Sequence, residues 1–357
     1  MLHLFGLAVL GVPLSWRKVN GGVQVEWVGY FMDLGRFELG VTEKRAQWVV
    51  RWLGDKIAER QVRLGDLREG LGRLQFVAGA LEVVRPFLGP LYRWASAGPR
   101  YARPFLPVMI RLLMGFIAKE IGQSRMSKCV DRDRDLGEVF RLDAKAEGEE
   151  VAIGGWRSEG GRPTREAAWF AVKLNRRNAP WAFARGETFR VIASLELLGM
   201  LVGTMVLMPV SEFSVATPSV GLVTIGCGTD NRGNSFLLDR LLTTAYPLGI
   251  LLCELAVQLR TRGAVMRAEW VPRLQNEEAD ALTNSDFRHF SEELRVPVKL
   301  EELRFEILDQ LLETGEAYLS EVEAARSQEK LRLAGTAGSA GHGRKRTGAS
   351  LREREPW

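Results

Sequence analysis

The order of strands and helices between residues 136 and 290 constrains the fold of this chain more than any other feature. Three β-rich runs come first, at 138–146, 151–156 and 167–174, and the turn sequence EGEE joins the first two as a hairpin. An apolar helix, a strand, two helices divided at Pro247, a short strand and a last helix follow. This order predicts a mixed α/β layer in which helices cover a sheet.

Residues 1–123 are expected to form a separate, mostly helical unit. The turn sequence NGG at residues 20–22 predicts a hairpin within residues 12–42, and Thr42 is in position to cap the helix that follows. Two helices broken near Pro86 and a third apolar helix complete the unit.

The polar residues 124–135 are expected to form the boundary between the two units. Beyond the α/β layer, an acidic amphipathic helix is predicted within residues 291–330, and the Gly-, Ala- and Arg-rich residues 331–357 are expected to be disordered. Eight Lys or Arg and three Glu lie in residues 326–357, which accounts for the whole formal net charge of +5. The net charge therefore indicates a basic tail and says little about the folded part.

Cysteine usage and apolar stretches favour an intracellular protein, in the cytoplasm or nucleus. None of the three cysteines has a partner at CxxC spacing, which argues against a zinc ribbon or a disulfide framework. Residues 1–16 have no basic residue before their apolar core and are interpreted as a buried helix rather than a signal peptide. Residues 192–210 are nearly long enough to cross a bilayer, but Glu196 lies in the first turns, so a buried helix is favoured and no membrane partner is expected.

Four acidic residues stand among apolar neighbours in these predicted elements. They are Asp143 in mid-strand, Glu196 on an apolar helix, Asp230 at a strand end and Asp280 in the last helix. If the strands of Asp143 and Asp230 are adjacent, the four carboxylates converge and repel one another. Mg²⁺ prefers carboxylate oxygens, and two such ions can activate water for phosphodiester hydrolysis. Spacing alone leaves a second interpretation open, in which the four acids are unrelated.

The segments around these acids resemble, in chain order, the four acidic motifs of ribonuclease H domains. The likeness covers residues 136–290 and is strongest to domains that follow reverse transcriptase in tyrosine-recombinase and LTR-type retroelements. It rests on FRLDAKAEGEEVAIGGW, IASLELLGMLV, VTIGCGTDNRGN and WVPRLQNEEADALTN. Residues 5–97 resemble the end of a reverse transcriptase palm followed by its thumb and connection.

The resemblance implies a ribonuclease H-like mixed sheet with flanking helices, preceded by a mostly helical reverse transcriptase remnant. It also implies that Asp143, Glu196, Asp230 and Asp280 are catalytic ligands of two Mg²⁺ ions, or of Mn²⁺. The substrate implied is an RNA–DNA hybrid, with hydrolysis of the RNA strand selected by A-form-like geometry and 2′-hydroxyl contacts.

The sequence departs from the family in two places. No Tyr-x-Asp-Asp turn occurs, so we expect no DNA synthesis from this chain. A missing polymerase portion or a partner chain would have to supply that activity. No His precedes Asp280 where the family leads one to expect it; His289 lies beyond it, and Glu269 or another group would have to substitute. Two alternatives follow: a catalytically inactive nucleic-acid-binding remnant, and an integrase- or resolvase-type nuclease that does not need Glu196.

Five further side chains are candidate contacts to a nucleic-acid backbone: Asn231, Lys145, Asn276, Arg157 and Arg177. Asn231 either contacts substrate or forms an Asx turn, and Asn276 is favoured as a helix cap. Lys145 should share a strand face with Asp143, although a solvated lysine is the simpler interpretation. The two arginines belong to a segment that interleaves arginine with tryptophan. Such a segment suits a nucleic-acid backbone, although tryptophans near strands are more often core residues.

Overall fold

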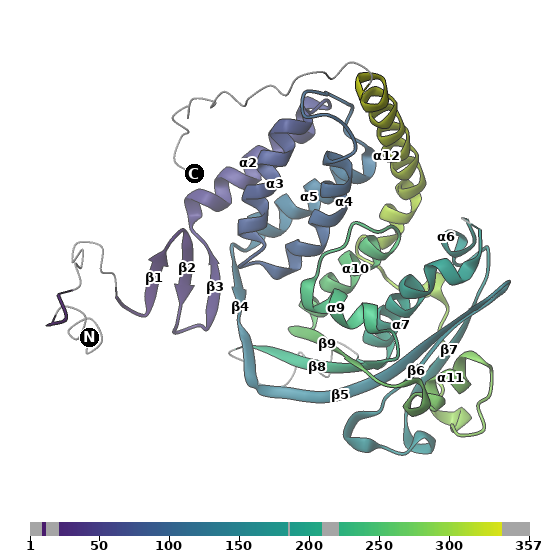
Figure 1. Cartoon of the computed structure of the whole chain (residues 1–357). Coiled ribbons are helices and arrows are strands. Elements are labelled where there is room, and N and C mark those ends of the chain that lie inside the picture. The colour runs from purple at the N-terminus through teal and green to yellow at the C-terminus, as the bar shows by residue number, and fades with distance from the viewer. Residues whose placement is uncertain (1–8, 12–20, 185, 209–220, 338–357) are drawn as a thin grey trace.

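The computed structural model describes residues 9–11, 21–184, 186–208 and 221–337, and this part of the chain contains two sheets with helices around them (Figure 1). Four short antiparallel strands form the first sheet in the order β1-β2-β3-β4. They are β1 Gln24–Trp27, β2 Tyr30–Asp33, β3 Glu38–Val41 and β4 Met126–Lys128. Strand β4 lies far along the sequence from the other three strands and pairs with β3 at one edge of this sheet.

Apolar faces of the N-terminal helices bury much of the core. The helices are α2 Glu43–Glu59, α3 Leu64–Val77, the 3₁₀ helix η2 Glu82–Phe87, α4 Leu88–Ala95 and α5 Val108–Gln123. In α2, Ala46, Val49 and Leu53 are buried at helical spacing, as the sequence predicts. Thr42 is at the N-cap position but makes no side-chain capping hydrogen bond. Burial of the apolar stripe therefore stabilises this helix more than its cap does.

Two local predictions for this unit are wrong. The strand expected after the NGG turn is two strands, because Val28 and Gly29 turn the chain between β1 and β2 with positive φ. Residues 12–20, which were to form the other half of the hairpin, lie outside the described residues. The break expected near Pro86 lies instead at residues 78–81, since Pro86 stands inside η2, which continues directly into α4.

Both ends of the described chain also differ from expectation. Of the N-terminal segment expected to be a buried helix, only residues 9–11 are described, and Val9 and Leu10 are exposed. At the other end, α12 Leu308–Ala337 continues through residues 331–337, which we expected to be disordered. The basic residues farther along the tail lie outside the described residues.

Five strands form the second sheet in the order β7-β6-β5-β8-β9. They are β5 Val130–Glu147, β6 Glu150–Trp156, β7 Trp169–Leu174, β8 Leu222–Thr229 and β9 Ala264–Trp270. Neighbours β5, β6 and β7 are antiparallel, whereas β8 is parallel to β5 and β9 is parallel to β8. The predicted mixed α/β layer with a ribonuclease H-like sheet is therefore confirmed by strand order and direction.

Helices α7 and α11 lie on opposite faces of this sheet (Figure 1). The longer helices are α7 Ile192–Val206, α9 Arg232–Arg240, α10 Leu248–Thr261 and α11 Glu277–Thr283. Shorter ones are η3 Glu159–Gly161, η4 Thr164–Glu166, α6 Pro180–Phe183, η5 Thr188–Val191, η6 Arg273–Gln275, η7 Glu292–Leu294 and η8 Leu300–Glu302. Leu142 of β5 faces Gly199 of α7, while the next residue, Asp143, faces α11, as strand alternation requires.

One helical stretch, Thr188–Val206, is long and apolar enough to cross a membrane by length and composition alone. Most of it is buried, and α7 packs against β5, β6 and α10. These contacts give its apolar side chains a protein environment, which agrees with the interpretation of this segment as a core helix.

The two parts of the chain share one continuous cluster of buried side chains. Residues 124–135, expected as a boundary, form β4 and the start of β5 rather than a linker. Helix α12 adds two links: Tyr318 donates a hydrogen bond to the carbonyl of Pro90, and the buried carboxylate of Glu254 accepts three backbone N–H groups at residues 306–308. The contacts of Glu254 satisfy backbone N–H groups at the start of α12 and anchor it to α10.

Gly154 sets how closely α11 approaches the sheet. It pairs with Asp143 across β5 and β6, and a Cβ at this position would lie 2.7 Å from Cβ of Leu282 in α11. We expect Gly154→Ala to lower the free energy of unfolding by about 1–3 kcal/mol, because α11 must move outward.

Urea denaturation measures this change. Gly72→Ala is the matched control, because Gly72 stands in α3 with open space around it. There the same substitution should stabilise the protein by about 0.5–1 kcal/mol through helix propensity. A stabilising Gly154→Ala would show that α11 is not packed against β6 as described.

Candidate active site

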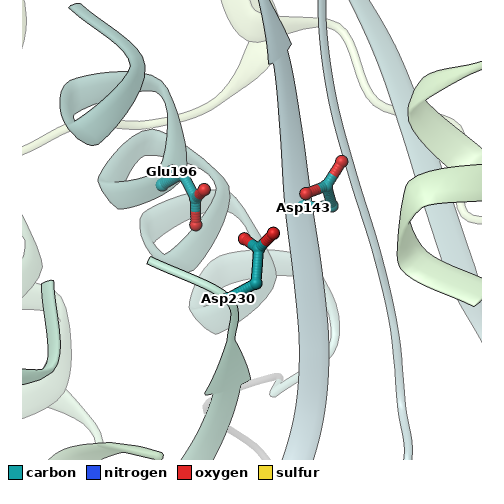
Figure 2. A group of neighbouring side chains, drawn as sticks. All are labelled: Asp143, Glu196 and Asp230. Atoms are coloured by element: carbon teal, nitrogen blue, oxygen red, sulfur yellow. The ribbon is translucent and has the colours of Figure 1, made fainter. Parts of the chain in front are cut away.

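Three of the four predicted acids lie together, and each comes from a different element (Figure 2). Asp143 is in β5, Glu196 is in the second turn of α7 and Asp230 directly follows β8. The parallel register pairs Arg141 with Gly228, so Asp143 and Asp230 each stand two residues beyond a paired position. One carboxylate oxygen from each acid lies within 4.8 Å of the others.

Burial makes this cluster costly for the folded protein. Asp143 is 7% exposed and Glu196 is 3% exposed. Burial raises the pKa of Asp143 to about 7, and the nearby charges of Asp230 and Asp280 add to this effect. Burial also raises the pKa of Glu196 well above its usual value, with further contributions from Asp230 and Asp143. A bound cation would offset this cost, because it stabilises the charged form of each carboxylate.

Two threonines that sequence reasoning missed hold the buried carboxylates. Thr229 donates a hydrogen bond to Oε2 of Glu196 at 2.6 Å, and Thr283 donates to Oδ2 of Asp143 at 2.9 Å. Thr229 directly precedes Asp230, and Thr283 lies almost one turn after Asp280. Their places beside predicted acids were the available signal, because a hydroxyl next to a buried carboxylate supplies a donor that the carboxylate needs.

Asp280 lies beside the three-acid cluster but outside it. Its Oδ1 lies 3.3 Å from a guanidinium nitrogen of Arg273, and its Oδ2 accepts a hydrogen bond from the side-chain amide of Asn284 at 2.9 Å. The hydroxyl oxygen of Thr283 is 2.9 Å from both Oδ2 of Asp143 and the carbonyl oxygen of Asp280, so the two acids are close neighbours. The expected convergence of four carboxylates is therefore seen for three of them.

The two asparagines have structural contacts. Asn231 is the N-cap of α9, and its side-chain oxygen accepts backbone N–H groups of Gly233 and Asn234, which is the Asx-type alternative. Asn276 precedes α11 but makes no side-chain capping bond, contrary to the favoured expectation. Instead its amide donates to the carbonyl of Leu142 at 3.0 Å, which ties the start of α11 to β5 next to Asp143.

The basic candidates lie in ion pairs or turns. Lys145 pairs with Glu150 at 2.9 Å and Glu147 at 3.4 Å, and Arg157 pairs with Glu159 at 2.8 Å. Arg177 is exposed in the turn after β7. The interleaved tryptophans Trp156, Trp169 and Trp181 are all buried, so they are core residues and offer no stacking surface. The sequence around these three tryptophans does not distinguish a ring that faces the core from one that faces solvent.

A tryptophan outside that segment lies at the edge of the acid cluster. Trp270, at the end of β9, is 50% exposed, and its indole nitrogen donates to the carbonyl of Asp230 at 3.1 Å. The guanidinium of Arg232 lies 5.9 Å from the centre of the Trp270 ring, within cation–π range. Neither residue was singled out from the sequence, although Arg232 follows Asp230 by two positions.

The donor set suits a hard divalent cation. All three clustered side chains are carboxylates whose oxygens are close enough to share an ion, and burial leaves the charges of Asp143 and Glu196 poorly solvated. His289, the histidine nearest to Asp280 in sequence, is exposed beyond α11, and Glu269 is also exposed. Oxygen ligands of this kind favour hard divalent cations over softer metals.

The raised pKa of Asp143 predicts that its substitution increases the stability of the protein in a pH-dependent way. In metal-free buffer, the folded state holds a proton on Asp143 up to about pH 7, whereas the unfolded chain loses it near pH 4. The native protein therefore loses stability as pH rises through this window, at up to about 1.4 kcal/mol per pH unit. Asp143→Asn does not titrate, so we expect it to be more stable than the native protein at pH 8 and nearly equal at pH 4.

Thermal or urea unfolding in EDTA at both pH values tests this. Asp55→Asn, at an exposed position of α2, serves as the control and should shift stability little at either pH. Equal stability of Asp143→Asn and the native protein at pH 8 would contradict the burial cost assigned to this carboxylate.

Comparisons with known proteins give only distant structural likenesses. No protein-family model matches the chain, and a search of curated proteins found no match. Ribonuclease H1 from the halophilic archaeon Halobacterium salinarum NRC-1 matches with 17% identity and a TM-score of 0.26, covering 43% of this chain and 98% of that one. The foamy viral protease–reverse transcriptase dRH in complex with double-stranded DNA matches with 11% identity and a TM-score of 0.24, covering 70% of this chain and 38% of that one. Strand order and direction define the fold, and the three acids define the site by their own geometry.

Proposed function

We propose that this protein is a divalent-metal-dependent nuclease that hydrolyses the RNA strand of RNA–DNA hybrids. The observation that carries the proposal is the group of three carboxylates on β5, α7 and the end of β8, of which Asp143 and Glu196 are buried. Buried acids without a compensating partner are expensive, and such perturbed carboxylates gather at functional sites. The order of the acids along a ribonuclease H-like sheet favours phosphodiester hydrolysis over other metal chemistry.

Asp143, Glu196 and Asp230 would hold the first ion, and Asp280 would join Asp143 in holding the second. When bound, such a pair of ions supplies an activated water and stabilises the leaving oxygen of a phosphodiester. Thr229 and Thr283 orient the carboxylates of Glu196 and Asp143 through the hydrogen bonds described above. The tie from Asn276 to Leu142 keeps α11, and with it Asp280, next to β5.

Substrate would approach over the edge marked by Trp270 and Arg232. A half-exposed indole and a guanidinium beside an acid cluster suit a sugar–phosphate backbone with a base or ribose against the ring. Selection of RNA would come from A-form-like geometry and contacts to the 2′-hydroxyl. In this proposal Lys145, Arg157 and Arg177 contribute at most outer contacts, because the first two already pair with acids.

Cleavage of a labelled hybrid by purified protein in Mg²⁺ tests the reaction. We expect products from the RNA strand and none from duplex DNA, and Asp143→Asn should lower the rate by about a thousandfold or more, since a metal ligand contributes several kcal/mol to the transition state. Asp239→Asn, in α9 and outside the cluster, is the matched control and should retain activity.

Each alternative has a distinct outcome in the same assay. Hybrid binding without turnover, equal in native protein and Asp230→Asn, would replace the nuclease with a nucleic-acid-binding remnant. Undiminished cleavage by Glu196→Gln would favour the integrase- or resolvase-type alternative.

The role given to Trp270 predicts a binding defect. Trp270→Ala should weaken hybrid affinity by about fivefold to a hundredfold, because loss of a stacking ring costs about 1–3 kcal/mol. Fluorescence anisotropy in EDTA measures affinity without cleavage. Tyr101→Ala is the matched control, since Tyr101 is also an exposed ring below an arginine but lies in the N-terminal unit. Equal affinity of Trp270→Ala and the native protein would remove Trp270 from the substrate path.

A further inference from the structure

We propose that Arg273 is a positioning residue that holds Asp280 apart from the three-carboxylate cluster until a nucleic-acid phosphate takes over its guanidinium. The proposal rests on the proposed function for its ligand, a sugar–phosphate backbone. It adds a link between substrate binding and completion of the acid set.

The contact between Arg273 and Asp280 is of the kind that a ligand can displace. Arg273 lies in η6, its side chain is 80% exposed, and the nitrogen–oxygen distance is 3.3 Å. Exposed ion pairs of this type contribute only about 0–1 kcal/mol, because water solvates both partners. The pair is therefore a weak restraint on where the Asp280 carboxylate points.

The backbone of Asp280 lies beside one member of the cluster. Its carbonyl oxygen is 2.9 Å from the hydroxyl of Thr283, which also contacts the Asp143 carboxylate, so the backbone of Asp280 is already beside Asp143. Its two carboxylate oxygens are engaged by Arg273 and Asn284 on the outer side. A change in side-chain direction, with the helix in place, would bring the fourth acid to the other three.

Arg273 stands where an incoming phosphate would meet it. Its side chain is 80% exposed and lies 3.3 Å from Asp280, and the charges of Asp230 and Asp143 also act on its guanidinium. It lies in the connection from β9 to α11, three residues after Trp270, which ends β9. A guanidinium matches the paired oxygens of a phosphate and binds them more strongly than a single exposed carboxylate oxygen at 3.3 Å.

Phosphate binding and metal binding are then coupled through Asp280. A backbone phosphate that engages Arg273 releases the Asp280 carboxylate, and the released carboxylate adds negative charge and a ligand to the cluster. The complex with nucleic acid would thus bind the metal more tightly than the free protein does. The coupling cannot exceed the strength of the ion pair that is broken.

Two binding measurements on Arg273→Gln test the proposal without recourse to turnover. Calorimetric titration of the free variant with Mn²⁺ should show an affinity for Mn²⁺ up to about fivefold higher than that of the native protein. This factor corresponds to the free energy of one lost exposed ion pair. Hybrid binding in EDTA should weaken, and the slope of log affinity against log salt should fall by about one phosphate contact. Arg288→Gln is the matched control, because Arg288 is 83% exposed and pairs with Asp286 just beyond α11. It removes the same charge without touching Asp280.

A second variant separates release of Asp280 from a general loss of positive charge. Adding Asp280→Asn to Arg273→Gln should abolish the gain in Mn²⁺ affinity, since no carboxylate remains to be released. A gain that persists in the double variant, or that Arg288→Gln reproduces, would overturn the proposal, as would unchanged hybrid affinity. Failure of the proposed function has a different signature. If the native protein cuts no hybrid but Arg273→Gln still changes Mn²⁺ and hybrid binding as described, only the proposed function is contradicted.

Discussion

The parallel pairing of β5 with β8 is the interaction on which the site depends. These strands are separated by more than seventy residues of sequence, and their register at Arg141 and Gly228 places Asp143 beside Asp230. Parallel strands need a crossover, and α7 lies within it, so the same connection brings Glu196 to the sheet. The backbone hydrogen bonds of one strand pair thus fix two acids directly, and the crossover helix supplies the third.

The three clustered carboxylates that would bind metal also lower the stability of the fold. Three carboxylates packed within 4.8 Å, two of them almost fully buried, weaken the fold at neutral pH in the absence of a cation. The surrounding structure tolerates this cost because the neighbouring strands β6 and β8 are largely buried. Thr229 and Thr283 each satisfy one oxygen and reduce the penalty without removing it. A site arranged in this way gains stability when a divalent ion binds, which couples metal binding to folding.

Close packing of α11 is a second requirement. Gly154 leaves room for Leu282, and Asn276 reaches from the start of α11 to the backbone of β5. Together they place Asp280 next to Asp143, where its carboxylate oxygens contact Arg273 and Asn284. Small changes in this helix therefore affect the fourth acid more than the first three.

Sequence patterns predicted the elements well where one periodicity dominated. The β5–β6 hairpin, β7, α7, β8 and β9 fall where alternation or apolar spacing indicated. Errors arose where tertiary contacts overruled a local signal. The polar residues 130–135 read as a linker but form strand because β8 offers them backbone partners, and Pro86 is accommodated within a 3₁₀ turn. The tryptophans near β6 and β7 are buried, in agreement with their favoured interpretation as core residues rather than a binding surface.

The sequence by itself determined the order of strands and helices, the candidate acids and the oxygen-rich character of the site, because periodicity and residue type are local properties. Only the tertiary structure decided which acids meet, that Trp270 rather than the buried tryptophans borders them, and that Arg273 holds Asp280 aside. Those outcomes depend on strand register and on side-chain direction across elements distant in sequence. Neither is encoded in the spacing of residues along the chain.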